Sequence, residues 1–290
     1  MANSFCLPSH SGVAPLLQRH LHRAVNQRNS GQVIAGMVLL LAVCGWISGG
    51  EEGARRAVTE GTVPSDAPAV SPKAMQRQFG ARLLQPYDMP ALFAMLRDIC
   101  RRAHLPRLPD LYYIADPDSM NAYALGRPDG SAITVTEGLL RGLAPRELAA
   151  ILAHEVAHIR NNDGSAMGWA AALQRAISLS SVVGLMTLQR HKGGPATPAQ
   201  PLALLLSAAS GIAQLLCLAL SRVRELDADA LALDLIDDPQ ALVAALHKLE
   251  RHHASRQVAA LAAREDDLVR FLRSHPATYE RVGILLRLAH

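Results

Sequence analysis

The sequence is poor in aromatic residues and in cysteine. Phe, Trp and Tyr make up 4% of the 290 residues, although half of the residues are hydrophobic. A hydrophobic content supplied mainly by Leu and Ala favours helices and argues against a mainly β protein. The four cysteines form no C-x-x-C pair and no spacing typical of a secreted disulfide framework. A disulfide-stapled secreted domain is therefore excluded.

The charge pattern argues against nucleic acid as a partner. The chain has a formal net charge of +4 and a pI near 9.1, which suits anionic partners in general. Its arginines, however, are scattered and are not interleaved with aromatic side chains, as they are in many nucleic-acid-binding surfaces. We therefore expect no nucleic-acid partner.

Long apolar runs are present, and the first lies near the N-terminus. Residues 33–48 carry no charge and approach the length that crosses a bilayer, so we expect a basic N-terminal tail over 1–32 and a transmembrane anchor over 33–49. A cleaved signal peptide or a lipoprotein signal fits less well. The leader before the apolar run is too long for the first, and bulky Val43 precedes Cys44 in the second.

The segment after this anchor changes in character. Residues 50–78 are rich in charge, proline and small side chains, which predicts a linker that neither spans a membrane nor packs in a core. From 79 to 290, helical patterns surround the short β-type runs LYYIAD, NAYAL and AITVT. We expect one mainly α-helical domain with a small antiparallel β-sheet, plus transmembrane helices.

An apolar hairpin over 166–220 interrupts this domain. Residues 202–220 carry no charge and could cross a bilayer, whereas 166–189 contains Gln174 and Arg175. A cation at the bilayer centre costs roughly 2.5 to 3.5 kcal/mol on insertion scales. The alternative is an amphipathic hairpin that packs on the domain instead of crossing the membrane.

The main chemical signal is HEVAH at 154–158. A proline in the first turn predicts a helix over 145–161, on which His154 and His158 lie one turn apart on the same face. Two imidazoles can then bind one zinc ion, and Glu155 can act first as general base and then as general acid in peptide hydrolysis. Because chance alone gives the pattern in roughly one chain of sixty, its context has to support it.

A catalytic zinc ion normally has three protein ligands, so one more is needed. The metzincin pattern is excluded, because Asn161 and Gly164 stand where it requires glycine and histidine. Further along, SRVRELDADALAL places Glu225 and Asp229 four residues apart on an amphipathic helix. Glu225 can ligate a metal and Asp229 can orient a ligand histidine, which predicts a site with two histidines and one glutamate.

These residues resemble those of the HtpX-type membrane zinc peptidases, which are related to the type 1 CAAX prenyl proteases. Five similar motifs occur in one order between about residue 79 and the C-terminus: NAYALG at 121–126, TEGLL at 136–140, LAHEVAHIRNND at 152–163, SRVRELDAD at 221–229 and RSHPATYER at 273–281. The resemblance implies an α-rich zincin-type metallopeptidase domain with a small sheet and with helices that cross the membrane.

The resemblance also implies which residues form the site. One Zn2+ per subunit takes its ligands from the set described above, with Glu155 as the base and Asp229 behind a ligand histidine. Asn121 matches an asparagine that holds the substrate backbone, and His275 matches a histidine that stabilises the oxyanion. Arg281 is expected to pair with a nearby carboxylate in a structural role.

The topology follows from a geometric constraint. Because His158 and Glu225 must meet at one ion, the chain between them has to leave and return on one side, and a single N-terminal span then places the N-terminus opposite the site. Basic residues near the spans divide equally between Arg19, Arg23, Arg28, Arg190 and Lys192 on the N-terminal side and Arg55, Arg56, Arg160, Arg222 and Arg224 on the catalytic side. The resemblance favours a cytoplasmic site at a bacterial-type inner membrane.

The leading hypothesis is a membrane-bound zinc endopeptidase that uses zinc-activated water. Its expected partners are the lipid bilayer and protein or peptide substrates, in particular membrane or misfolded proteins, which suggests membrane-protein quality control. The alternative is a non-catalytic membrane adaptor that binds zinc. Processing of prenylated peptides is a third hypothesis, which rests on the resemblance alone.

Overall fold

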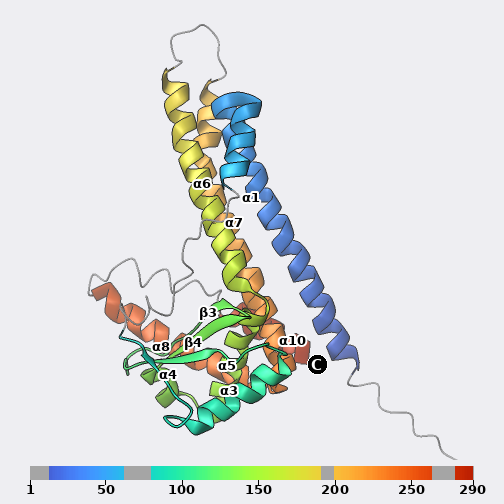
Figure 1. Cartoon of the computed structure of the whole chain (residues 1–290), viewed down its shortest axis with the longest axis vertical. Coiled ribbons are helices and arrows are strands. Elements are labelled where there is room, and N and C mark those ends of the chain that lie inside the picture. The colour runs from blue at the N-terminus through green and yellow to red at the C-terminus, as the bar shows by residue number, and fades with distance from the viewer. Residues whose placement is uncertain (1–12, 62–79, 191–198, 263–277, 290) are drawn as a thin grey trace, which may run out of the picture.

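The computed structural model describes residues 13–61, 80–190, 199–262 and 278–289. A small domain lies at one end, and a bundle of long helices extends from it (Figure 1). The helices are α1 (Val13–Gly61), α3 (Pro90–Arg102), α4 (Glu137–Gly142), α5 (Pro145–Arg160), α6 (Asp163–Arg190), α7 (Ala199–Ile236), α8 (Pro239–Ala262) and α10 (Thr278–Ala289). The strands are β1 (Arg82–Leu83), β2 (Asp110–Ile114), β3 (Ala122–Arg127) and β4 (Gly130–Thr136).

The sheet of the domain has the strand order β1-β2-β4-β3. The mainly helical fold with a small sheet is confirmed, and the three predicted β-type runs match β2, β3 and β4. The sheet is mixed, however, and not purely antiparallel, because β2 and β4 pair in parallel, with Leu111 opposite Ile133. The reason is that β4 returns from the β3–β4 hairpin into the position beside β2. Apolar patterning within strands does not encode this order.

Helix α5 lies at the centre of the domain core. Its side chains Leu152, Val156 and Ile159 are buried together with Ile133 and Val135 of β4. Burying apolar side chains of this size contributes about 1.5 to 3 kcal/mol each before the entropic cost of folding. The face that carries the histidines is thereby held in a fixed orientation relative to the sheet.

The beginning of α5 is determined by local chemistry. Pro145 stands in the first turn, where its missing N–H leaves no hydrogen bond unmade. The Glu147 carboxylate accepts hydrogen bonds from the backbone N–H of Ala144 at 2.7 Å and from Lys248 Nζ at 2.6 Å. The predicted helix over 145–161 is confirmed, since α5 ends at Arg160.

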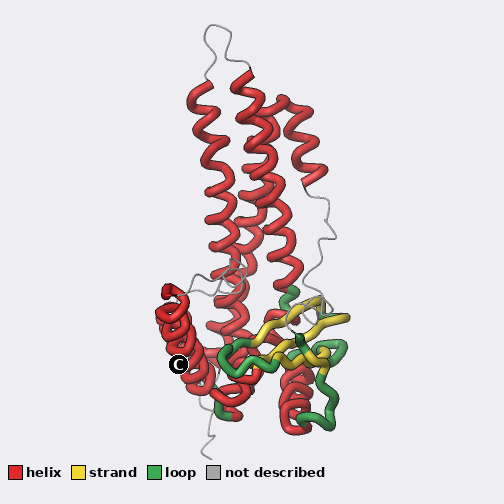
Figure 2. Tube along the Cα trace, turned by 90° about the vertical axis from the view of Figure 1, so that its left-hand side faces the viewer, coloured by secondary structure: helices red, strands yellow, loops and turns green. Residues whose placement is uncertain are grey.

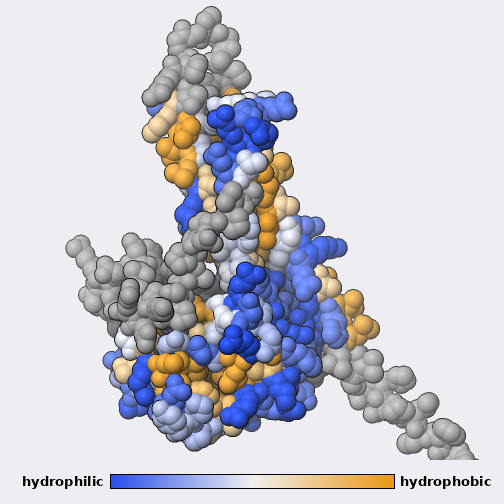
Figure 3. Space-filling view, in the orientation of Figure 1, coloured by the Kyte–Doolittle hydropathy of each residue, from blue (hydrophilic) through white to orange (hydrophobic). Residues whose placement is uncertain are grey.

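The bundle consists of α1, α6 and α7, which pack around Met37, Leu41, Leu173, Ile177 and Leu206. In the described part of the chain, these three helices are long and apolar enough to cross a membrane. Figure 2 shows that they extend away from the domain and do not lie on it. Hydrophobic patches lie on both sides of the bundle in Figure 3, as expected for helices that face lipid.

The first half of α1 differs from the expected N-terminal tail. Residues 13–32 are helical, and α1 contacts α10 of the domain. Arg19 donates from Nε to the carbonyl of Leu288 at 3.0 Å and forms an ion pair with Asp234 at 3.1 Å. The N-terminal end of α1 therefore lies beside the domain, and the prediction that it lies on the opposite side is wrong.

A bend in α1 explains this error. The helix breaks at Gly49 and Gly50, and residues 51–61 run back along the first segment. Gly50 has φ 62° and ψ −150°, a conformation that is essentially confined to glycine. The linker expected over 50–78 is therefore helical up to Gly61, and its remainder lies outside the described residues.

Close packing joins the two segments of this bend. A Cβ atom built on Gly45 would lie 2.5 Å from the carbonyl oxygen of Gly53, so glycine at these positions lets the segments touch. The returning segment carries exposed charges, among them Glu52 paired with Arg55 and Arg56. Figure 3 shows a hydrophilic patch near the far end of the bundle. The charged residues of this segment suggested a linker. Its other side is apolar and packs on the first segment of α1.

Candidate metal centre

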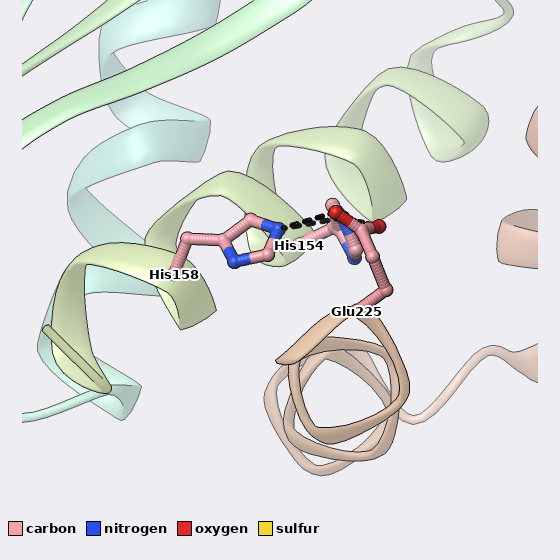
Figure 4. Close-up of side chains that lie close together, drawn as sticks. All are labelled: His154, His158 and Glu225. Atoms are coloured by element: carbon pink, nitrogen blue, oxygen red, sulfur yellow. Dashed lines mark hydrogen bonds and ion pairs between the residues drawn. The ribbon is translucent and has the colours of Figure 1, made fainter. Parts of the chain in front are cut away.

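Two histidines of α5 and one glutamate of α7 converge in the domain (Figure 4). The Nε2 atoms of His154 and His158 are 3.0 Å apart. Glu225 Oε2 lies 3.4 Å from His154 Nε2, and Glu225 Oε1 lies 3.6 Å from His158 Nε2. Among the described residues, these three side chains form a group whose ligand atoms all lie within 4.8 Å of one another. Glu225 thus meets two histidines from which it is separated by more than 60 residues of sequence.

The spacing of these atoms suits a metal ion. Ligand atoms about 2.0 to 2.2 Å from one tetrahedral zinc ion are about 3.3 to 3.6 Å from each other. The two Nε2 atoms are 3.0 Å apart, and each lies close to that range from a different oxygen of Glu225, at 3.4 and 3.6 Å. Two imidazoles and one carboxylate are also ligands that zinc accepts. The three residues could therefore hold such an ion with little rearrangement.

Asp229 fixes the orientation of His154. Its Oδ1 atom lies 3.0 Å from His154 Nδ1, and its side chain is almost fully buried. An Nδ1–H group that donates to this carboxylate leaves the Nε2 lone pair directed toward Glu225 and His158. Without a metal, burial lowers the pKa of His154, but hydrogen bonds to Asp229 and Glu225 outweigh burial and raise the pKa to about 10.

Asp163 fixes His158 in the same way. Its Oδ2 atom lies 2.7 Å from His158 Nδ1 across the turn that follows α5. Asn162 makes this turn possible with φ 56°, in the left-handed region that asparagine tolerates better than most residues. Burial and the His154 charge lower the pKa of His158, but Asp163 and Glu225 leave it above its ordinary value.

Sequence reasoning missed this role of Asp163. The residue belongs to the quoted motif LAHEVAHIRNND, but it lies beyond the end of α5, where helical spacing no longer predicts which side chains meet. The available signal was an acidic residue immediately after two asparagines, which favour a tight turn.

Arg281 of α10 pairs with two carboxylates of the site. It binds both oxygens of Asp229, at 2.6 and 2.7 Å, and its Nη1 atom lies 3.3 Å from Glu225 Oε2. Arg281 was expected to pair with a nearby carboxylate, and it pairs with two. The sequence did not indicate that both carboxylates belong to the candidate metal centre. Burial lowers the pKa of Arg281, but the charges of Asp229 and Glu225 outweigh it and raise the pKa.

The other predicted residues occupy different positions. Glu155 is buried next to His154 on α5, and its charge is among those that raise the pKa of Arg281. Asn121 immediately precedes β3, a strand that packs against α5. Its Nδ2 atom donates to Ser119 Oγ at 2.8 Å, and its Oδ1 atom is 3.0 Å from His253 Nε2. His275 lies outside the described residues.

Comparison with known families agrees with this geometry, since residues 87–289 match the family model described as peptidase family M48. The chain belongs to peptidase family M48. It is 31% identical over 278 residues to a protein named Protease HtpX homolog from Methylibium petroleiphilum. The match covers 90% of this chain and 97% of that protein. A protein of the same name from Burkholderia ambifaria is 31% identical over 280 residues, which is 91% and 97% of the two chains.

A solved structure has a similar fold. The crystal structure of S. mikatae Ste24p matches with a TM-score of 0.50 at 19% sequence identity, and the match covers 92% of this chain and 66% of that protein. The resemblance to HtpX-type peptidases is therefore confirmed. This M48 member is a protease, and its three apolar helices and its relatives make it an integral membrane protein.

Proposed function

We propose that the chain is a zinc-dependent membrane endopeptidase in which His154, His158 and Glu225 bind the metal. The observation that carries the proposal is their convergence, with all ligand atoms within 4.8 Å of one another. A carboxylate behind each imidazole adds support, because metal-binding histidines commonly have such partners. A zinc ion held by these residues would supply Lewis acidity, which would polarise a peptide carbonyl and make a nearby water more acidic.

Glu155 acts as the general base in this proposal. Its carboxylate takes a proton from the attacking water and then delivers it to the departing amine, so that the peptide bond is replaced by a carboxylic acid and an amine. Its position beside His154 on one helix keeps it next to the metal ligands. Asn121 holds the substrate backbone, and His275 donates to the oxyanion, as the resemblance implies.

Asp229, Asp163 and Arg281 position the reacting groups. Asp229 and Asp163 keep the two imidazoles in the tautomer that presents Nε2. Arg281 balances the charges of Asp229 and Glu225, which would otherwise repel each other inside the protein. The site is therefore assembled from α5, α7 and α10 together.

The position of the site favours substrates at the membrane. α7 contributes Glu225 and also continues into the apolar bundle, so the metal centre lies at the end of a candidate membrane span. We infer that the natural substrates are membrane or misfolded proteins and that the enzyme serves membrane-protein quality control.

The catalytic domain lies on the cytoplasmic side in this proposal. Because α1 starts beside the domain, the basic residues of its first half lie on the domain side of the membrane. The count of basic residues on each side therefore differs from the count based on the sequence. Arg19, Arg23, Arg28, Arg160, Arg222 and Arg224 belong to the domain end, against Arg55 and Arg56 after the bend of α1 and Arg190 at the end of α6, while Lys192 lies outside the described residues. The excess at the domain end agrees with the preference of basic residues for the cytoplasm. Protease treatment of inside-out membrane vesicles should remove an N-terminal tag and the domain together.

The Glu155→Gln variant tests the mechanism directly. Glutamine keeps the shape of the side chain but cannot take a proton, so the variant should bind one equivalent of zinc while cleavage of unfolded casein is lost. Stoichiometric zinc in the wild-type protein without cleavage of any offered protein would favour a non-catalytic adaptor. Cleavage that resists both chelators and this substitution would contradict the mechanism.

A further inference from the structure

Asp227 of α7 is a buried carboxylate that the proposed chemistry does not use. Its side chain has 0% exposure, and it forms an ion pair with Arg23 Nε at 3.4 Å. Asn161 Nδ2 donates a hydrogen bond to its other oxygen at 3.1 Å. A buried carboxylate is costly unless a cation and hydrogen bonds compensate it, so Asp227 depends on the groups around it.

A second arginine lies between Asp227 and the metal centre. Arg224 binds Asp163 through Nε and Nη2, and its Nη2 atom is also 3.9 Å from Asp227 Oδ2. Asp163 in turn holds His158. Arg224 therefore lies between two buried carboxylates, and only the nearer one holds a histidine of the site.

Arg23 comes from a distant part of the sequence, the first half of α1. Besides its ion pair with Asp227, it donates from Nη2 to Asn161 Oδ1 at 3.4 Å. Asn161 is the C-cap residue that follows α5, and Asp163 comes two residues later. One guanidinium thus joins α1 both to α7 and to the turn that presents Asp163 to His158.

We propose that Arg23 is a positioning residue for His158, because by compensating Asp227 it leaves Arg224 to Asp163, which orients the imidazole. Without Arg23, the uncompensated Asp227 draws Arg224 away from Asp163, and His158 loses its fixed partner. Helix α1 then supports the metal centre through Arg23, in addition to its place in the membrane bundle. This inference rests on the proposed function, since it takes His158 to be a metal ligand.

The test measures metal binding by the full-length protein in detergent. Replacing groups behind a metal ligand commonly lowers affinity about 10- to 100-fold, so Arg23→Gln should weaken zinc binding by about tenfold in a chelator competition and alter the visible spectrum of the Co2+-substituted protein. Arg28→Gln is the matched control on an exposed position of the same helix. Arg102→Gln is a structural control, since Arg102 joins α3 to the carbonyl of Leu235 at 3.1 Å. Both controls should leave affinity and spectrum unchanged.

A double variant separates positioning from simple docking of α1. Asp227→Asn removes the charge that competes for Arg224, so Arg23→Gln combined with Asp227→Asn should regain most of the lost zinc affinity and the wild-type Co2+ spectrum. Arg23→Lys retains a cation beside Asp227 and should stay near wild-type affinity, even if the glutamine variant does not fold. The proposal is overturned if Arg23→Gln binds zinc like the wild type, if the double variant is as weak as the single one, or if the lysine variant loses affinity. A wild-type protein that binds no metal would instead contradict the proposed function.

Discussion

Asp163 and His158 lie on opposite sides of the turn that ends α5, with 2.7 Å between Oδ2 and Nδ1. Because the carboxylate holds the Nδ1–H, the opposite ring nitrogen is available for a metal. Asp229 has the same relationship to His154 at 3.0 Å. Each proposed histidine ligand therefore has its own carboxylate, and the two carboxylates come from different helices.

The Asp163→Asn variant should weaken metal binding. Asparagine fills the same space, but it carries no charge to hold the Nδ1–H form of His158. We expect zinc affinity to fall about 10- to 100-fold, measured by competition with a chromophoric chelator. Asp110→Asn, at an exposed position at the start of β2, is the control and should bind like the wild type. Unchanged affinity in Asp163→Asn would show that this carboxylate does not support the ligand.

The Arg281→Met variant should destabilise the metal-free protein more than the metal-loaded one. Methionine removes the cation between Asp229 and Glu225, and breaking a buried ion pair typically costs about 3 to 5 kcal/mol. A bound metal ion restores positive charge beside Glu225, so zinc should offset part of this loss. Thermal unfolding in detergent, with and without zinc, measures the difference. Arg287→Met on the exposed side of α10 is the control, and an equal effect there would contradict the prediction.

Zinc affinity should rise with pH. In the metal-free protein the pKa of His154 is about 10, well above the ordinary 6.5, so the imidazole is protonated at neutral pH and must release its proton to bind metal. Protonated His154 stabilises the metal-free fold fully below pH 6.5, and this contribution is lost as the pH rises through about 10. Calorimetry in buffers of different ionisation enthalpy should detect proton release on zinc binding at pH 8. Binding without proton release would contradict this assignment.

The sequence was most informative where residues act through local spacing. HEVAH lies on a helix whose beginning is determined by Pro145 and Glu147, so the relative placement of His154 and His158 follows from helical geometry alone. Glu225 could be proposed because one more ligand was needed. Its 3.4 Å separation from His154 Nε2 depends on how α5 packs against α7, which only the tertiary structure provides.

Two features could not be read from the sequence for physical reasons. The path of α1 depends on the bend at Gly50, and a charged stretch after an apolar run does not reveal that its other side packs back on the helix. The role of Asp227 depends on Arg23, which lies more than 200 positions away. Charge pairs between such distant residues leave no local pattern.

The Asn121→Ala variant should affect substrate binding more than metal binding. Asn121 immediately precedes β3, and its side-chain amide contacts Ser119 and His253. Removing a fixed hydrogen-bond donor for the substrate backbone should raise KM for a model peptide, whereas zinc affinity should stay at the wild-type value. Steady-state kinetics and chelator competition on the same preparation measure both. Ser131→Ala on β4 is the control, a removal of a small polar group away from Asn121, Ser119 and His253. A normal KM in Asn121→Ala would show that Asn121 does not bind the substrate.

The Gly50→Ala variant should destabilise the bundle, and Gly49→Ala provides a closely matched control. Neither added Cβ would meet another atom within 4 Å, so packing does not distinguish the two positions. Their backbones do: Gly50 has φ 62° with ψ −150°, whereas Gly49 has φ −159°, which any residue adopts. Forcing alanine into the conformation of Gly50 costs about 1 to 3 kcal/mol. The thermal midpoint in detergent should therefore fall for Gly50→Ala and change little for Gly49→Ala. Equal midpoints would mean that the bend does not depend on the left-handed conformation of Gly50.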